Sequence, residues 1–197
     1  MTNASIRAAH DHEFPALSYL LGQAFFDDPV AAYLLPDAKL RSRRLPSLYR
    51  TWLPWLSRHG IVYTDEGCRG AAVWQAPSPP RPDRLDELRM GISTLATARS
   101  AMLRVLAIGR AVAPAHFADP HWYLAILGTE PNSWGQGIGS ALMAPVLQRC
   151  DEERLPAYLE SSKETNLQFY ARHGFEVTGE LQVPGGPTLW PMLRVPR

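Results

Sequence analysis

Apolar residues recur at helical spacing in two stretches of the first sixty residues. The first stretch places them three and four positions apart, which predicts an amphipathic helix at Phe14, Leu17, Leu20, Leu21, Ala24 and Phe25. The turn-forming run Asp27, Asp28 and Pro29 should end that helix. The second stretch repeats the spacing at Leu45, Leu48, Tyr49, Trp52 and Leu56, before the stop at His59 and Gly60.

Shorter apolar runs predict strands before a proline-rich segment. Residues 5–9, 61–63 and 71–74 are short strand candidates, and the last two should form a hairpin. Residues 76–83 contain four prolines in eight positions, which predicts a linker or a rigid loop. Helical spacing then returns for about thirty residues, up to Leu106.

The C-terminal part alternates strands and helices. Strands are predicted at residues 122–129, 157–160, 175–177 and 189–195, and helices at residues 137–149 and after Ser161. Pro145 should bend the first of these helices. Ser161 and Glu164 have capping-box spacing at the start of the second, and Gly174 is placed to end it. The order of elements predicts a mixed α and β domain.

Composition and charge exclude several classes of protein. The chain has 197 residues, 46% apolar and 20% charged, which fits one folded domain rather than disorder or a coiled coil. A net charge of +1 gives no overall field to attract nucleic acid or an anionic membrane, so neither is an expected partner. The two cysteines are far apart, with no clustered histidines, and we expect no metal. Without a signal-peptide pattern or a membrane-spanning stretch, we expect a cytoplasmic protein.

Three glycines, Gly135, Gly137 and Gly139, lie between the strongest strand and the following helix. Glycines there let backbone N–H groups converge at a helix N-terminus, which suits an anion such as a pyrophosphate. The alternative is a flexible turn that is glycine-rich without function. A dinucleotide-binding fold is disfavoured because position 140 is Ser and too little chain follows. A P-loop is excluded because no Lys-Ser or Lys-Thr follows the glycines.

Three segments together resemble the GCN5-related N-acetyltransferases, the GNAT superfamily. They read GTEPNSWGQGIGSALM, PAYLESS and NLQFYARHGF, at residues 128–143, 156–162 and 166–175. Within the family the chain is most similar to puromycin N-acetyltransferase and its relatives, also through AAVWQAP and VPGGPTLWPM. The resemblance implies a single domain over residues 1–197 with a mixed, mostly antiparallel twisted sheet flanked by helices. It also implies a helical insertion at about residues 83–113, before the cofactor-binding strand.

The resemblance implies acetyl-CoA as the co-substrate. Leu127, Gly128 and Thr129 match the strand that pairs with the pantetheine arm, and Asn166 matches a contact to that arm. The pyrophosphate-binding loop of the family corresponds to Gly135, Gln136, Gly137, Ile138, Gly139 and Ser140. Trp134 stands where the family usually has Gln or Arg. Two roles are possible for this side chain: it could cover the adenine, or it could pack on the loop.

Two residues are candidates for the chemistry. Tyr170 matches the tyrosine beside the acetyl-CoA sulfur and is four residues from Asn166, on the same helical face. A phenol suits protonation of a leaving thiolate, although ring packing in the helix is the alternative. Glu160 ends a strand and is placed to accept the amine proton, directly or through water. Its alternatives are capping the next helix or pairing with an arginine, and His121 is a weaker base candidate.

Aromatic residues of the N-terminal third are the candidates for holding the acceptor. Phe26, Tyr33 and Trp52 could contact a flat, hydrophobic amine, with core packing as the alternative. We therefore expect acetyl transfer to a primary amine of a small aromatic or hydrophobic molecule, such as a puromycin-like aminonucleoside. Acetylation of proteins or peptides, or a regulatory acyl-CoA-binding module with little turnover, are the alternatives. The enzyme should act as a monomer or a homodimer.

Overall fold

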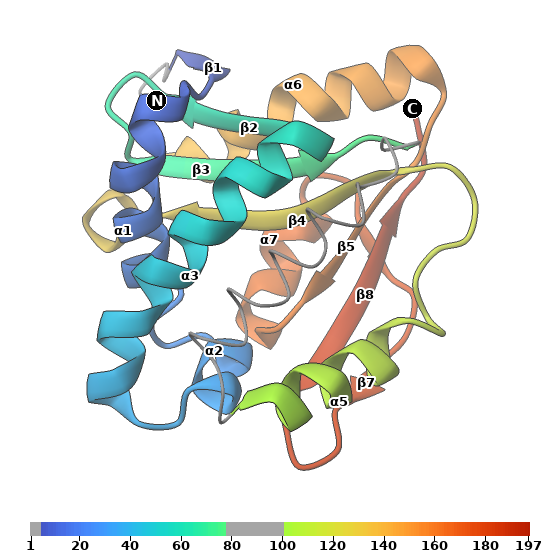
Figure 1. The fold of residues 1–197 in the computed structure, drawn as a ribbon. Coiled ribbons are helices and arrows are strands. Elements are labelled where there is room, and N and C mark those ends of the chain that lie inside the picture. Colours follow the sequence, from blue (N-terminus) through green and yellow to red (C-terminus); the bar gives the residue numbers. More distant parts are fainter. Residues whose placement is uncertain (1–4, 78–100) are drawn as a thin grey trace.

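An eight-stranded twisted sheet forms the centre of the part of the chain that the computed structural model describes, residues 5–77 and 101–197 (Figure 1). Its strand order is β1-β2-β3-β4-β5-β8-β6, and β7 pairs with β8. The elements, in chain order, are β1 (Ile6–Ala8), a 3-10 turn (Asp11–Glu13), α1 (Phe14–Ala24), α2 (Pro29–Leu34), α3 (Ala38–His59), β2 (Gly60–Asp65), β3 (Gly70–Gln75), α5 (Met102–Val112), β4 (Trp122–Thr129), a 3-10 turn (Pro131–Ser133), α6 (Ile138–Glu153), β5 (Ala157–Ser161), a 3-10 turn (Glu164–Asn166), α7 (Leu167–Ala171), β6 (Glu176–Val177), β7 (Leu181–Gln182) and β8 (Thr188–Arg194). Among the described strands, β4 and β5 pair in parallel and the other pairs are antiparallel. The predicted mixed, mostly antiparallel fold is confirmed.

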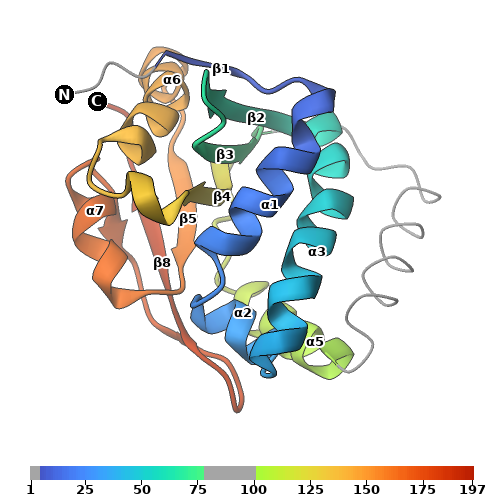
Figure 2. The same ribbon diagram turned by 90° about the vertical axis from the view of Figure 1, so that its left-hand side faces the viewer.

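Helices cover both faces of the sheet (Figure 2). On one face α1 and α3 bury the apolar stripe that their helical spacing predicts, with Leu17, Leu21 and Leu53 fully buried. On the other face α6 packs Leu142 and Met143 against β3, β4 and β5. Among the described helices, none is both long and apolar enough to cross a membrane.

The side-chain alternation of β4 reverses part-way along the strand. Trp122 and Leu124 pack on the α6 side, whereas Ile126 packs on the α1 and α3 side. The register explains the change, because Trp74 pairs with Leu124 and the neighbouring Val73 pairs with Ile126. A bulge at Ala125 therefore shifts the strand by one residue, as bulges do where a strand must re-aim its side chains.

Strands β4 and β5 part soon after they meet. Their ladder contains the pairs Trp122–Ala157 and Tyr123–Tyr158. Beyond them β5 continues on β8 to Ser161, and β4 continues on β3 to Thr129. The far half of β4 therefore has β3 on one edge and no described strand on the other. This divergence creates the cleft described below.

The structure differs from the sequence-based predictions in local details. Asp28 and Pro29 end α1 as expected but also start α2, since Asp28 caps it by accepting from the N–H groups of Val30 and Ala31. The predicted capping box does not form: Ser161 Oγ donates to Lys163 O instead. The short strand β7 was not predicted. Of the predicted insertion, α5 is described, whereas residues 78–100, with most of the proline-rich segment, lie outside the described residues.

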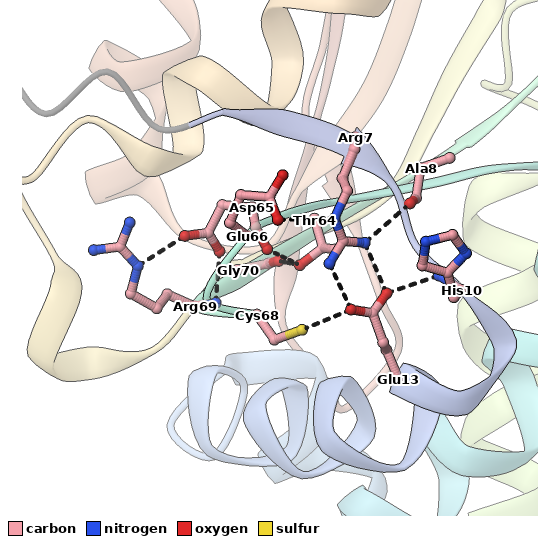
Figure 3. A network of polar contacts seen from close by, with 10 residues as sticks. All are labelled: Arg7, Ala8, His10, Glu13, Thr64, Asp65, Glu66, Cys68, Arg69 and Gly70. Atoms are coloured by element: carbon pink, nitrogen blue, oxygen red, sulfur yellow. Dashed lines mark hydrogen bonds and ion pairs between the residues drawn. The ribbon is translucent and has the colours of Figure 1, made fainter.

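A polar network ties β1 to the turn between β2 and β3 (Figure 3). Arg7 donates to both carboxylate oxygens of Glu13, at 2.6 and 2.9 Å. The same carboxylate accepts from the backbone N–H of His10 and from the thiol of Cys68. Glu66, in the turn, accepts a hydrogen bond from Arg7 Nε at 3.3 Å. These hydrogen bonds, led by Arg7, hold the pKa of Glu13 well below its ordinary value.

We expect Glu13→Gln to lower Tm at neutral pH and to lower it less in acid. A carboxyl group whose pKa is lower in the folded state stabilises the fold above its unfolded pKa, about 4.3. Its contribution disappears as pH falls through the folded-state value. Thermal unfolding from pH 3 to pH 7 measures the gap between wild type and variant, which should narrow steadily below about pH 4.3.

Glu66→Gln is the matched control, because this second carboxylate on Arg7 is 65% exposed, against 11% for Glu13. Exposed ion pairs contribute little to stability. A Tm gap for Glu13→Gln that stayed constant down to pH 3 would show that shape, rather than charge, matters at this position.

Candidate active site

A cleft of about 510 Å³ opens where β4 and β5 diverge. Its wall on β4 is Leu127, Gly128 and Thr129, and its roof is the loop and first turn leading into α6. Helix α1 closes one side with Ala24 and Phe25, and α7 closes the other with Phe169 and Tyr170. The cleft brings together nine of the ten predicted cofactor-binding residues: Leu127, Gly128, Thr129, Gly135, Gly137, Ile138, Gly139, Ser140 and Asn166. The tenth, Gln136, is not part of the lining, and its side chain donates to Asn132 O.

The glycine loop presents backbone donors to this cleft. Gly137 is the N-cap of α6 in the left-handed conformation, with φ +82°, and no side chain caps the helix. The first N–H groups of a helix have no partner within the helix, so those of the first turn are free to meet an anion. A Cβ on Gly137 would meet nothing within 4 Å, so the space above the loop is open. Ile138 is buried and anchors the turn in the core.

We expect Gly137→Val to weaken CoA binding by about 10- to 100-fold, or ~1.4 to 2.8 kcal/mol. The new side chain would occupy the open space in front of the helix N-terminus, and a β-branched residue is strained at positive φ. Calorimetric titration of CoA measures the change.

Gly185→Val is the matched control, because Gly185 also has positive φ, +66°, and open space at its Cβ. Gly185 lies between β7 and β8, outside the cleft lining. If both variants bound CoA as wild type does, the glycine loop would not be the anion site.

Tyr170 faces the cleft from α7. Burial, together with the negative charge of Asp28, raises its pKa well above the ordinary value. The phenol therefore keeps its proton at any working pH and can act as a donor. Asp28 also lines the cleft and accepts a short hydrogen bond from Ser162, which ties the start of α2 to the end of β5.

Glu160 lies on β5, two residues past its last pairing with β4, and does not line the same cleft. Tyr123 pairs with Gln75 on β3. Because its neighbour Leu124 faces α6, Tyr123 points to the opposite face of the sheet, which α1 and α3 cover. Tyr158, its partner across the ladder, and Glu160 point to that same face. The carboxylate accepts from the Tyr123 hydroxyl at 2.8 Å and faces His116 Nδ1 at 3.4 Å.

The three predicted acceptor-binding residues lie in the turn after α1, on α2 and on α3, outside the cleft lining. Phe26 lies under the guanidinium of Arg41, whose Cζ is 4.7 Å from the ring centroid. Tyr33 donates to Pro184 O at 3.0 Å, and Trp52 packs edge-on against Tyr49. Among the neighbouring aromatics it is Phe25 that reaches the cleft.

Sequence reasoning missed most of a second aromatic group. His116 and Phe117, from the loop between α5 and β4, pack with His121, Tyr123 and Tyr158. Alternation along β4 and β5 would have indicated the two tyrosines. No sequence signal identified the loop residues as their partners.

Trp134 lies at the mouth of the cleft. Its side chain is 62% exposed, and its indole N–H donates to Thr129 O at 3.2 Å. The ring therefore packs on the loop in this structure while keeping most of its surface in solvent. Within the described ranges, no group of three or more His, Cys, Asp or Glu side chains is placed to hold a metal ion.

Comparison with known proteins identifies the family. The model of the acetyltransferase (GNAT) domain matches residues 96–195, half of the chain. This chain belongs to the GNAT acetyltransferases. It is 28% identical over 166 residues to an uncharacterized N-acetyltransferase of Schizosaccharomyces pombe, covering 79% of this chain and 67% of that protein. The enzyme is thus an acetyl-CoA-dependent N-acetyltransferase.

Solved acetyltransferase structures share the fold of this chain. A structure from Corynebacterium glutamicum, described as histone acetyltransferase HPA2 and related acetyltransferase, superposes with a TM-score of 0.73 at 25% identity. The match covers 98% of this chain and 97% of that one. Arylalkylamine N-acetyltransferase 2 from Aedes aegypti has a TM-score of 0.54 at 14% identity over 100% of both chains, which shows the shared fold alone.

Proposed function

We propose that this GNAT enzyme acetylates the primary amine of a small aromatic or hydrophobic molecule, such as a puromycin-like aminonucleoside, and that residues 1–197 act as one catalytic domain. The observation that carries the proposal is a ring-lined carboxylate, Glu160, at the point where β4 and β5 part. Rings of His116, Tyr123 and Tyr158 surround it. A buried carboxylate surrounded by aromatic rings suits an acceptor that carries one amine on a flat, apolar ring system.

Each catalytic role in the proposal falls to a residue of this chain. Bound acetyl-CoA supplies an activated thioester. Glu160 takes the proton of the acceptor ammonium, directly or through one water, which frees the nitrogen lone pair for attack. As the new C–N bond forms and the C–S bond breaks, the Tyr170 phenol donates its proton to the thiolate. The free edge of β4 at Leu127–Thr129 supplies N–H groups that polarise the carbonyl.

A panel of amines tests the proposed acceptor class. Acetyl-CoA-dependent thiol release is measured with puromycin, phenethylamine, hexylamine, spermidine, kanamycin and a histone-tail peptide. We expect kcat/KM for the two aromatic amines to exceed that for spermidine and kanamycin by at least about tenfold. Hexylamine separates the contribution of the ring from that of apolar length.

The other outcomes of the panel are equally informative. A preference for spermidine or kanamycin would reject the aromatic class. A preference for the peptide would favour acetylation of proteins, the activity named in the description of the Corynebacterium glutamicum relative.

A further inference from the structure

The side chains around Glu160 form a compact group, here called the His116 cluster: His116, Phe117, His121, Tyr123, Tyr158 and Glu160. His116 is at its centre, with its ring centroid 5.1 Å from those of His121, Tyr123 and Tyr158. The loop that carries it leaves the end of α5, where the N–H groups of Ala115 and His116 both donate to Val112 O. Tyr158 fastens the same loop by donating to Ala115 O at 3.2 Å. The imidazole is therefore held in place by both its backbone and its neighbours.

Glu160 and His116 differ sharply in their access to water. The Glu160 side chain is 7% exposed, whereas that of His116 is 38% exposed. Each carboxylate oxygen already has a partner, Tyr123 on Oε2 and His116 on Oε1. A base that takes up a proton in every turnover must also release it, and the buried Glu160 has little direct contact with solvent.

The other members of the cluster are poorly suited to carry that proton away. Burial and the nearby Glu160 charge raise the pKa values of Tyr123 and Tyr158, so both phenols stay protonated and do not release a proton to water. Burial lowers the pKa of His121, and a charge on His116 lowers it further. Its Nδ1 is also engaged with Asp119 O at 2.7 Å. An imidazole ring can both accept and donate a proton, and His116 is the imidazole of the cluster that contacts Glu160.

We infer that His116 is the proton exit of the active site, acting on the proposed base Glu160. The acceptor ammonium loses a proton to the Glu160 carboxylate and becomes the neutral amine. When the neutral His116 ring carries its hydrogen on Nε2, its free Nδ1 takes the proton from the Glu160 carboxyl, which returns to a carboxylate. The resulting imidazolium releases one proton to water at the exposed edge of the cluster, and exchange with water returns the ring to the form protonated on Nε2. In this scheme His116 moves the proton through Glu160 and does not itself take a proton from the acceptor nitrogen.

Chemical rescue tests the inference, which rests on the proposed role of Glu160. His116→Gly should lower kcat by about 10- to 100-fold, with KM for the amine little changed. Added imidazole should restore kcat in proportion to its free-base concentration. His116→Asn can still hydrogen-bond Glu160 but cannot carry a proton, so it should stay slow and should not respond to imidazole. The probe amine is phenethylamine, or spermidine if the wild type acetylates spermidine faster.

The control is His12→Gly, an exposed histidine in the 3-10 turn before α1. It should keep the wild-type rate and show no imidazole effect, which also tests whether imidazole itself is acetylated. A wild-type rate in His116→Asn would overturn the inference, because a structural hydrogen bond would then suffice. A slow Glu160→Gln with a fast His116→Gly would reject the proton exit and leave the base in place. Wild-type rates in both would reject the base as well.

Discussion

Replacing Tyr170 with phenylalanine is expected to lower kcat by about 10²- to 10⁴-fold, the usual contribution of a general acid. Phenylalanine keeps the ring packed against Phe169 and Phe175 and removes the proton donor alone. Acetyl-CoA affinity should change little, because ground-state binding does not use the transferred proton. Since burial keeps this phenol protonated, wild-type activity should show no loss from Tyr170 ionisation up to at least about pH 10. Steady-state kinetics with the fastest amine, together with cofactor titration, measure both quantities.

Tyr49→Phe is the matched control for Tyr170→Phe. Tyr49 is also a buried phenol whose pKa is raised by burial and by Asp28, but it belongs to the core under α3 and not to the cleft lining. Its rate should equal that of the wild type. If Tyr170→Phe also stayed within a few-fold of wild type, with chemistry rate-limiting, water or another group would be the proton donor.

Replacing Glu160 with glutamine is expected to lower kcat by a similar factor, about 10²- to 10⁴-fold. Glutamine can still accept a hydrogen bond from Tyr123 but cannot take a proton from the acceptor. The loss should be smaller at high pH, because more of the amine is then neutral in solution. The pH dependence of kcat/KM for phenethylamine in wild type and variant measures this.

Glu153→Gln is the control for that change. Glu153 likewise accepts from an aromatic donor of β4, Trp122, at 3.0 Å and pairs with a basic group, Arg149, but it lies on α6 on the other face of the sheet. It should leave kcat unchanged. A pH-independent loss in Glu160→Gln, equal at pH 6 and pH 9, would argue against proton abstraction by this carboxylate.

The sequence predicted the elements whose pattern is set locally. Strand β4 runs from Trp122 to Thr129, as its alternation and β-rich composition predict. Helix α6 continues to Glu153, past the predicted end, and Pro145 lies inside it. The glycine loop was recognisable because turn geometry and an anion site both require Gly at fixed positions.

What the sequence could not predict depends on contacts between distant segments. Phe25 and Phe26 are neighbours at the end of α1, and only packing of that helix on β4 decides that Phe25 faces the cleft. The partnership of His116 with Glu160 joins a loop to a strand 44 residues later. No local period encodes such a pairing, because the loop acquires its place from α5 and Tyr158.

Two residue pairs join β4 to β5, so the sheet consists of two β units held together at Trp122 and Tyr123 and by α6. A ligand that touches Leu127–Thr129 on one unit and α7 on the other bridges them. Such a ligand adds stability by mass action, about 2.7 kcal/mol at a hundred times its Kd. If acetyl-CoA is that ligand, as proposed, Tm should rise with its concentration.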